Sequence, residues 1–184
     1  IENNVVIMRV TTFNEQTMPN LEDGIKAVME QIGEKEPKGF VLDLRNNPGG
    51  LLSEAISVTD LFLDQGEIVS TRDREGKGER YKAIKGDIAE GKPLVILINA
   101  GSASASEIVA GALQDHRRAI VLGTKSFGKG SVQSVLPMGQ SGGIRLTTAR
   151  YYTPSGRSIQ ALGVTPDIFL KFKRVEESEE DKRK

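Results

Sequence analysis

One stretch, residues 94–133, constrains the fold of this chain more than any other. It begins with an apolar run, 94–98, which predicts a buried strand, and a short turn then leads to three serines that alternate with alanines. Apolar side chains recur at helical spacing from Ala105 to His116 and predict a helix. A second strand, 119–122, then runs into a glycine-bracketed loop that carries two lysines. The pattern therefore places serines at a helix N-terminus and lysines on a neighbouring loop.

This arrangement suits nucleophilic catalysis. The unpaired N–H groups and the positive end of the dipole at a helix N-terminus favour developing negative charge. A serine hydroxyl needs a base, and the single histidine, His116, lies about three turns along the same helix, too far to reach back. A lysine serves as the base when burial lowers the pKa of its amine toward neutrality. Lys129, between two glycines, is better placed for this role than Lys125.

The residues alone leave the identity of the nucleophile open. Ser102, Ser104 and Ser106 carry equally nucleophilic hydroxyls. Ser104 and Glu107 also form the S-x-x-E pattern of a capping box, in which the serine only caps the helix.

Nucleotide binding is a further alternative for the lysine loop. Residues 123–129 match a phosphate-binding loop up to the next position, where Gly130 replaces the Ser or Thr that would bind magnesium. A phosphate-binding loop opens a helix, whereas residues 131–137 are β-branched, short and closed by proline, which favours a strand. The context therefore counts against a nucleotide site.

Composition narrows the function classes. The 184 residues suffice for one well-buried domain, and 25 basic residues balance 25 acidic ones, so no global field attracts nucleic acid or an anionic membrane. The absence of cysteine excludes thiol catalysis, disulfides and thiolate zinc sites, and a single histidine excludes a histidine-rich metal site. No apolar run approaches the roughly 20 residues of a membrane span. No cofactor is indicated.

Strands and helices alternate along the first third of the chain, which predicts an α/β sheet with parallel crossovers. The expected elements are a strand in 4–11, a helix capped by Asn20 and stopped by Gly33, a strand at 39–44 and a helix at 51–62. A polar hairpin of 67–72 with 79–84 is expected to project into solvent, and 135–137 is expected to pair with 144–152. We expect one core domain over 1–170 and a charged, disordered tail over 171–184.

The turn at 47–50, Asn-Pro-Gly-Gly, follows the predicted strand 39–44. Open α/β sheets bind their ligands at the carboxyl ends of strands, and glycine lets a backbone approach a substrate closely. Most turns of this composition, however, only connect two elements.

Several motifs, in order along the chain, together resemble the C-terminal processing (tail-specific) peptidases, a family of serine peptidases. The motifs are D-L-R-N-N-P-G-G at 43–50, G-S-A-S-A-S-E at 101–107, G-T-K-S-F-G-K-G-S-V-Q at 123–133, Y-T-P-S-G-R at 152–157 and G-V-T-P-D at 163–167. The resemblance implies a ClpP/crotonase-like spiral core of ββα units with an added β hairpin, and a Ser-Lys dyad. It assigns the nucleophile to Ser104, the general base to Lys129, the orienting amide to Gln133 and the oxyanion hole to the amides of Gly50 and Ala105. The resemblance also includes an acid at Asp115, but a carboxylate at a helix C-terminus opposes the helix dipole, so Asp115 is interpreted as structural or orienting.

The resemblance also implies what such a protein acts on. Family members cleave polypeptides that have unstructured, apolar, free C-terminal tails, and a PDZ domain upstream of the core recognises the tail. No PDZ domain fits this sequence, which begins at Ile1 in a strand-like run and so reads as an excised piece. The family resemblance further implies an extracytoplasmic location, in the periplasm or at a membrane surface, and allows an oligomer. A non-enzymatic binding module on the same fold is the alternative.

Overall fold

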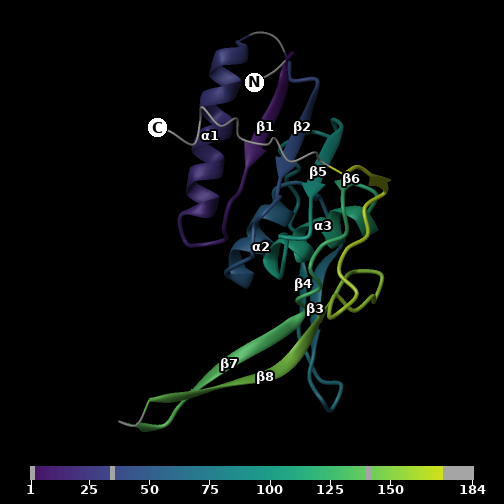
Figure 1. The fold of residues 1–184 in the computed structure, drawn as a ribbon. Helices are drawn as coiled ribbons and strands as arrows, with labels where there is room; N and C mark the ends of the chain where they lie inside the picture. Colours follow the sequence, from purple (N-terminus) through teal and green to yellow (C-terminus); the bar gives the residue numbers. More distant parts are fainter. Residues whose placement is uncertain (1–2, 34–35, 140–141, 172–184) are drawn as a thin grey trace, which may run out of the picture.

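The computed structural model describes residues 3–33, 36–139 and 142–171. Parallel strands form the central sheet in the order β1-β2-β5-β6-β9 (Figure 1). These strands are β1 (Val5–Arg9), β2 (Gly39–Asp43), β5 (Leu94–Ile98), β6 (Ile120–Gly123) and β9 (Ile168–Phe169). The helices are α1 (Thr17–Ile32), α2 (Leu52–Asp60) and α3 (Ala105–Asp115). The predicted parallel α/β sheet is confirmed.

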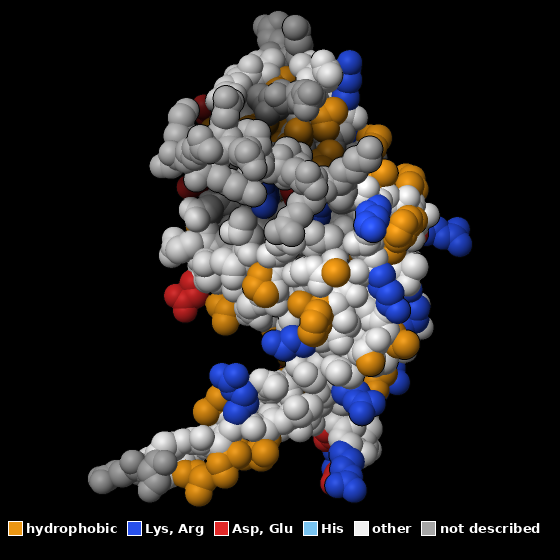
Figure 2. Space-filling view, in the orientation of Figure 1, with side chains coloured by type: hydrophobic (Ala, Val, Ile, Leu, Met, Phe, Trp, Pro, Cys, Tyr) orange, Lys and Arg blue, Asp and Glu red, His pale blue; other side chains and the backbone are white. Residues whose placement is uncertain are grey.

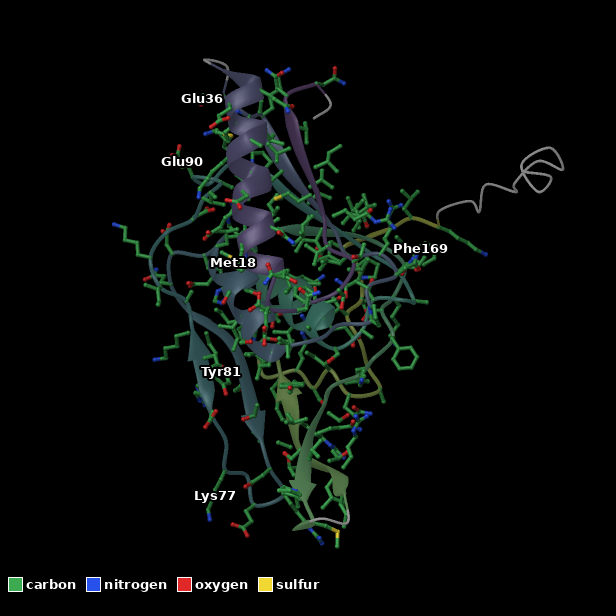
Figure 3. All side chains as sticks on the ribbon, turned by 90° about the vertical axis from the view of Figure 1, so that its left-hand side faces the viewer. Met18, Glu36, Lys77, Tyr81, Glu90 and Phe169 are labelled. Atoms are coloured by element: carbon green, nitrogen blue, oxygen red, sulfur yellow. The ribbon has the colours of Figure 1, made fainter. Side chains whose placement is uncertain are left out.

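An antiparallel sheet of order β4-β3-β8-β7 is added to this core. Its strands are β3 (Glu67–Arg72), β4 (Arg80–Lys82), β7 (Ser131–Pro137) and β8 (Gly143–Tyr152). The outer parts of β7 and β8 extend away from the rest of the molecule, and we call this pair the arm (Figure 1). Figure 3 shows Glu36 at one end of the molecule and Lys77, in the turn between β3 and β4, at the opposite end.

The prediction that the β3–β4 hairpin projects into solvent is wrong for β3. Ile68 and Val69 are completely buried, because β3 lies inside its sheet between β4 and β8 and contacts α3. The turn of this hairpin, residues 73–79, is exposed, as predicted, and the arm is a second hairpin that projects (Figure 1).

Helix α1 begins at Thr17, so the prediction of an N-cap at Asn20 is also wrong. The hydroxyl of Thr17 accepts the Asn14 N–H at 2.9 Å, and the Thr17 N–H donates to the Asn14 carbonyl at 2.8 Å, which closes a turn ahead of the helix. Pro19 is tolerated in the first turn, where backbone N–H groups have no helical acceptor. The predicted stop at Gly33 is confirmed, and its φ of 65° lies in the left-handed region that favours glycine.

Helix α3 is the most deeply buried helix of the described residues. Every residue from Ala105 to Leu113 is buried, because α2, β3 and β6 pack around it. A helix surrounded in this way holds its N-terminus, and the turn before it, in a single position.

The predicted tail lies almost wholly outside the described residues, since these end at 171. Within the described part of the chain, no helix has both the length and the apolarity needed to cross a membrane.

Candidate active site

The structure separates the three serines that the sequence leaves equivalent. Ser102 and Ser106 are completely buried, and their hydroxyls donate to the carbonyls of Leu44 at 2.8 Å and Asn47 at 3.0 Å. Ser104, between them, is partly exposed. It is therefore the serine of this turn whose hydroxyl a substrate can reach.

The backbone of Ser104 is strained. It has φ 56° and ψ −113° at the N-cap of α3, a conformation that residues with a side chain rarely adopt. Such strain persists only where the surroundings enforce it, and it is common at active sites. Here the strained residue joins the turn after β5 to a helix that is buried on all sides.

A buried carboxylate connects Ser104 to the lysine loop. Glu107 is completely buried, and its Oε2 accepts the backbone N–H groups of both Ser104 and Lys129, each at 2.8 Å. Its Oε1 accepts the Gly128 N–H at 2.7 Å and the hydroxyl of Ser126. The two N–H groups that share Oε2 belong to nitrogens within about 6 Å of one another. The predicted nucleophile and the predicted base are thus held side by side through their backbones.

These bonds also bear on the nucleotide alternative. A phosphate-binding loop turns its backbone N–H groups toward the phosphates, whereas those of Gly128 and Lys129 donate to Glu107. The segment that follows is strand β7, as predicted, and not a helix. Both observations argue against a phosphate site. In the described part of the chain, no group of His, Cys, Asp or Glu residues could hold a metal ion.

Lys129 itself is exposed, which differs from the buried position that a neutral amine requires. Lys125, the other lysine of the loop, is also exposed. The loop places the backbone of Lys129 beside Ser104 but leaves its side chain in water.

Gln133 lies in β7 at the base of the arm and is exposed. The structure records no hydrogen bond between it and Lys129 among the described residues. Simple strand alternation does not relate the two, because Lys129 precedes β7 and the pairing of β7 with β8 shifts between Val132 and Gln133.

The Asn-Pro-Gly-Gly turn lies directly against residues 103–105, the turn that carries the predicted nucleophile and that we call the nucleophile turn. A Cβ on Gly49 would lie 2.7 Å from the Cβ of Ser104 and 2.9 Å from the backbone nitrogen of Ala105. A Cβ on Gly50 would lie 1.9 Å from the carbonyl oxygen of Phe13, so both close approaches require glycine. Among the described residues, the N–H groups of Gly50 and Ala105 have no acceptor. One unused donor therefore belongs to the residue after Ser104, and the other to the residue after Gly49, which lies against Ser104.

Asp115 lies at the other end of α3, about 15 Å from Ser104 along the helix. Its carboxylate accepts the Ser155 N–H at 2.9 Å and pairs with Arg157. Burial raises the pKa of Asp115, but hydrogen bonds from Thr153 and Ser155 and the charge of Arg157 outweigh it and hold the pKa below its ordinary value. These contacts attach the loop after β8 to α3.

Sequence reasoning missed two residues of the site. For Glu107, the capping-box pattern pointed to a bond with Ser104 but not to the lysine loop, which lies about twenty positions further along. For Asn47, the turn pattern pointed to a bend and not to the contacts of a completely buried side chain.

Comparison with known proteins shows the family of this chain. The model of peptidase family S41 matches residues 4–170. A carboxy-terminal-processing protease of Bartonella bacilliformis is 57% identical over 171 residues, which are 92% of this chain and 39% of the relative. A carboxyl-terminal-processing protease of a Synechocystis species is 45% identical over 152 residues, 83% of this chain and 35% of the relative. The chain thus spans well under half the length of these relatives.

The solved structure of a photosystem II D1 C-terminal processing protease superposes with a TM-score of 0.84 at 38% identity, covering 91% of this chain and 42% of that one. The tricorn protease superposes with a TM-score of 0.50 at 15% identity over 92% of this chain and 16% of that one, a likeness of fold alone. The predicted ClpP/crotonase-like fold class is confirmed. The chain belongs to peptidase family S41, and within it to the serine peptidases that are named C-terminal processing proteases.

Proposed function

We propose that this chain is the catalytic core of a serine endopeptidase in which Ser104 is the nucleophile and Lys129 the general base. The observation that carries the proposal is the carboxylate of Glu107, which holds the backbones of both residues with one oxygen at 2.8 Å each. The accessibility of Ser104 and the two unused N–H donors beside it support the same assignment.

The reaction is acyl transfer in two halves. The neutral amine of Lys129 takes the proton of the Ser104 hydroxyl as the oxygen attacks the scissile carbonyl, and the Gly50 and Ala105 amides stabilise the oxyanion. Collapse of this intermediate breaks the C–N bond, and Lys129 returns the proton to the leaving amine. Water, deprotonated by the same lysine, then attacks the acyl-enzyme and restores the Ser104 hydroxyl.

Because Lys129 is exposed, the proposed mechanism requires the bound substrate to exclude water from its amine. Desolvation lowers the pKa of an amine, so the base becomes effective when something excludes water from it. A polypeptide bound across the lysine loop and the base of the arm supplies that cover. Gln133 lies at the base of the arm, within the region that such a polypeptide covers. Its side-chain amide then orients the amine of Lys129.

The substrate class comes from the relatives, whose names describe carboxy-terminal processing. We propose polypeptides with an unstructured, apolar, free C-terminus as substrates. Some relatives are named as chloroplastic. We propose that this protein acts outside the cytoplasm. Its oligomeric state is a separate property, to be measured in solution.

The test is cleavage of an unstructured peptide with an apolar C-terminus, followed by mass spectrometry. We expect Ser104→Ala and Lys129→Ala each to lower kcat by about a thousandfold or more. Lys125→Ala is the matched control, because Lys125 is an exposed lysine of the same loop, and it should cleave at the wild-type rate. Equal rates for all four proteins would refute the dyad. Binding of the peptide without cleavage by wild type would favour a binding module.

A further inference from the structure

Asn47 is a buried polar residue whose contacts reach both sides of the site. It follows β2, its side chain is completely buried, and both its side chain and its backbone carbonyl form hydrogen bonds. A buried amide is stable only when its donor and acceptor both have partners, so these bonds specify one orientation.

The side chain of Asn47 holds the glycine turn. Its Nδ2 donates to the carbonyl of Val10 at 2.8 Å, which anchors Asn47 to the end of β1. Its Oδ1 accepts the Gly49 N–H at 2.9 Å, which sets the course of the backbone immediately before Gly50.

The backbone of Asn47 holds the nucleophile turn. Its carbonyl oxygen accepts the Ala103 N–H at 2.9 Å and the Ser106 hydroxyl at 3.0 Å. Ala105, which carries the second free N–H, lies between these two residues. Asn47 thus forms hydrogen bonds with Gly49, the neighbour of Gly50, and with Ser106, the neighbour of Ala105.

We propose that Asn47 is a positioning residue that sets the separation and direction of the Gly50 and Ala105 amides. The inference rests on the proposed function, in which these amides stabilise the oxyanion. Donors of an oxyanion hole act through preorganisation, so a small displacement weakens the transition state more than it weakens the bound substrate. Loss of the Asn47 side chain should therefore lower kcat and leave KM nearly unchanged.

Asp87 provides a matched control outside the site. It forms the same type of turn, because its Oδ1 accepts the Ala89 N–H two residues ahead at 2.9 Å. Its side chain is also largely buried and pairs with Arg118. It lies in the connection between β4 and β5, so Asp87→Ala removes the same type of turn, together with the hydrogen bonds from Gly91 and Arg118, without touching the glycine turn.

The experiment measures kcat and KM for peptide cleavage, together with thermal unfolding, in wild type, Asn47→Ala, Asp87→Ala and Ser104→Ala. We expect Asn47→Ala to lower kcat by about ten- to a hundredfold, with KM within about threefold. Asp87→Ala should unfold at a lower temperature and keep kcat within about twofold of wild type. If Asn47→Ala keeps wild-type kcat while Ser104→Ala is inactive, the inference on Asn47 is overturned and the proposed function stands. If Ser104→Ala cleaves like wild type, the proposed function itself fails.

Asn47→Asp decides the question if Asn47→Ala does not fold. A protonated carboxyl reproduces the amide, because it donates to Val10 and accepts from Gly49, whereas a carboxylate cannot donate. Both of these partners are backbone groups and do not titrate. The ratio of kcat in Asn47→Asp to kcat in wild type should therefore rise as the pH falls. The protonation of the introduced carboxyl is followed by NMR over the same pH range. A ratio that stays near one after this carboxyl has lost its proton would overturn the inference.

Discussion

The serine half and the lysine half of the proposed site are built differently. Ser104 stands at the end of a helix that is buried from Ala105 to Leu113, and its turn is tied down by buried hydrogen bonds. Lys129 is exposed and leads directly into the arm, which carries apolar side chains into solvent (Figure 2). The exposed apolar residues of the arm are Val135, Leu136, Met138, Ile144 and Leu146. The fold completes the serine half by itself, whereas the lysine half still needs something to exclude water.

Glu107 joins the two halves, so its removal should have the largest effect on stability. Glu107→Ala leaves four donors without an acceptor in a buried position, and we expect it to lower the free energy of unfolding by about 3–5 kcal/mol and to abolish cleavage. Urea unfolding and peptide cleavage measure the two effects. Glu54→Ala is the control, because this half-buried carboxylate accepts only one backbone N–H among the described residues, that of Met18. Equal losses in the two variants would contradict the joining role.

The strain at Ser104 provides a sharper test of the serine half. At φ 56° a glycine is relaxed and an alanine is not, so Ser104→Gly should be more stable than Ser104→Ala by about 1 kcal/mol, although both lack the proposed nucleophile. Ser57, in the middle of α2, is the control position, where glycine should instead be about 1 kcal/mol less stable than alanine. Denaturant unfolding of the four variants measures both differences. The same order at both positions would show that Ser104 is not strained in solution.

The contacts of Asp115 attach the loop after β8 to the C-terminal end of α3, and their effect on stability should depend on pH. Its pKa is lowered in the folded protein, so its stabilising effect is present above the unfolded pKa of about 3.9 and is lost as the pH falls through the lower folded pKa. The difference in unfolding temperature between wild type and Asp115→Asn should therefore shrink as the pH is lowered from about 5 to 2. Because Asp43, whose pKa is also lowered, titrates alike in both proteins, it cancels in the comparison. A difference that widens in acid would contradict the assignment.

The arm should give the smallest effect. Leu136 is 48% exposed, so Leu136→Ser should change the free energy of unfolding by no more than about 0.5 kcal/mol. Urea unfolding of the two proteins checks this value. A loss above about 1 kcal/mol would mean that the arm is covered in solution and that the contrast with the serine half is smaller than the structure shows.

Much of the fold could be predicted from local patterns. The apolar run at 94–98 is strand β5, the helical spacing after it is α3, and the β-branched segment before Pro137 is β7. These predictions succeed because period and turn chemistry are properties of neighbouring residues. The β3–β4 hairpin shows the limit: its polar composition suggested solvent, but β3 is buried by β8 and α3, which are distant in the sequence.

The candidate site divides in the same way. The sequence by itself determined the candidates for the chemistry, a serine cluster at a helix N-terminus and a glycine-flanked lysine, because these are matters of residue type and spacing. Only the tertiary structure decided that the hydroxyls of Ser102 and Ser106 are buried and donate to backbone carbonyls. It also decided that Glu107 accepts hydrogen bonds from the lysine loop and that Lys129 is exposed. Burial and hydrogen-bond partners depend on residues brought together from distant parts of the chain, and a local pattern contains no information about them.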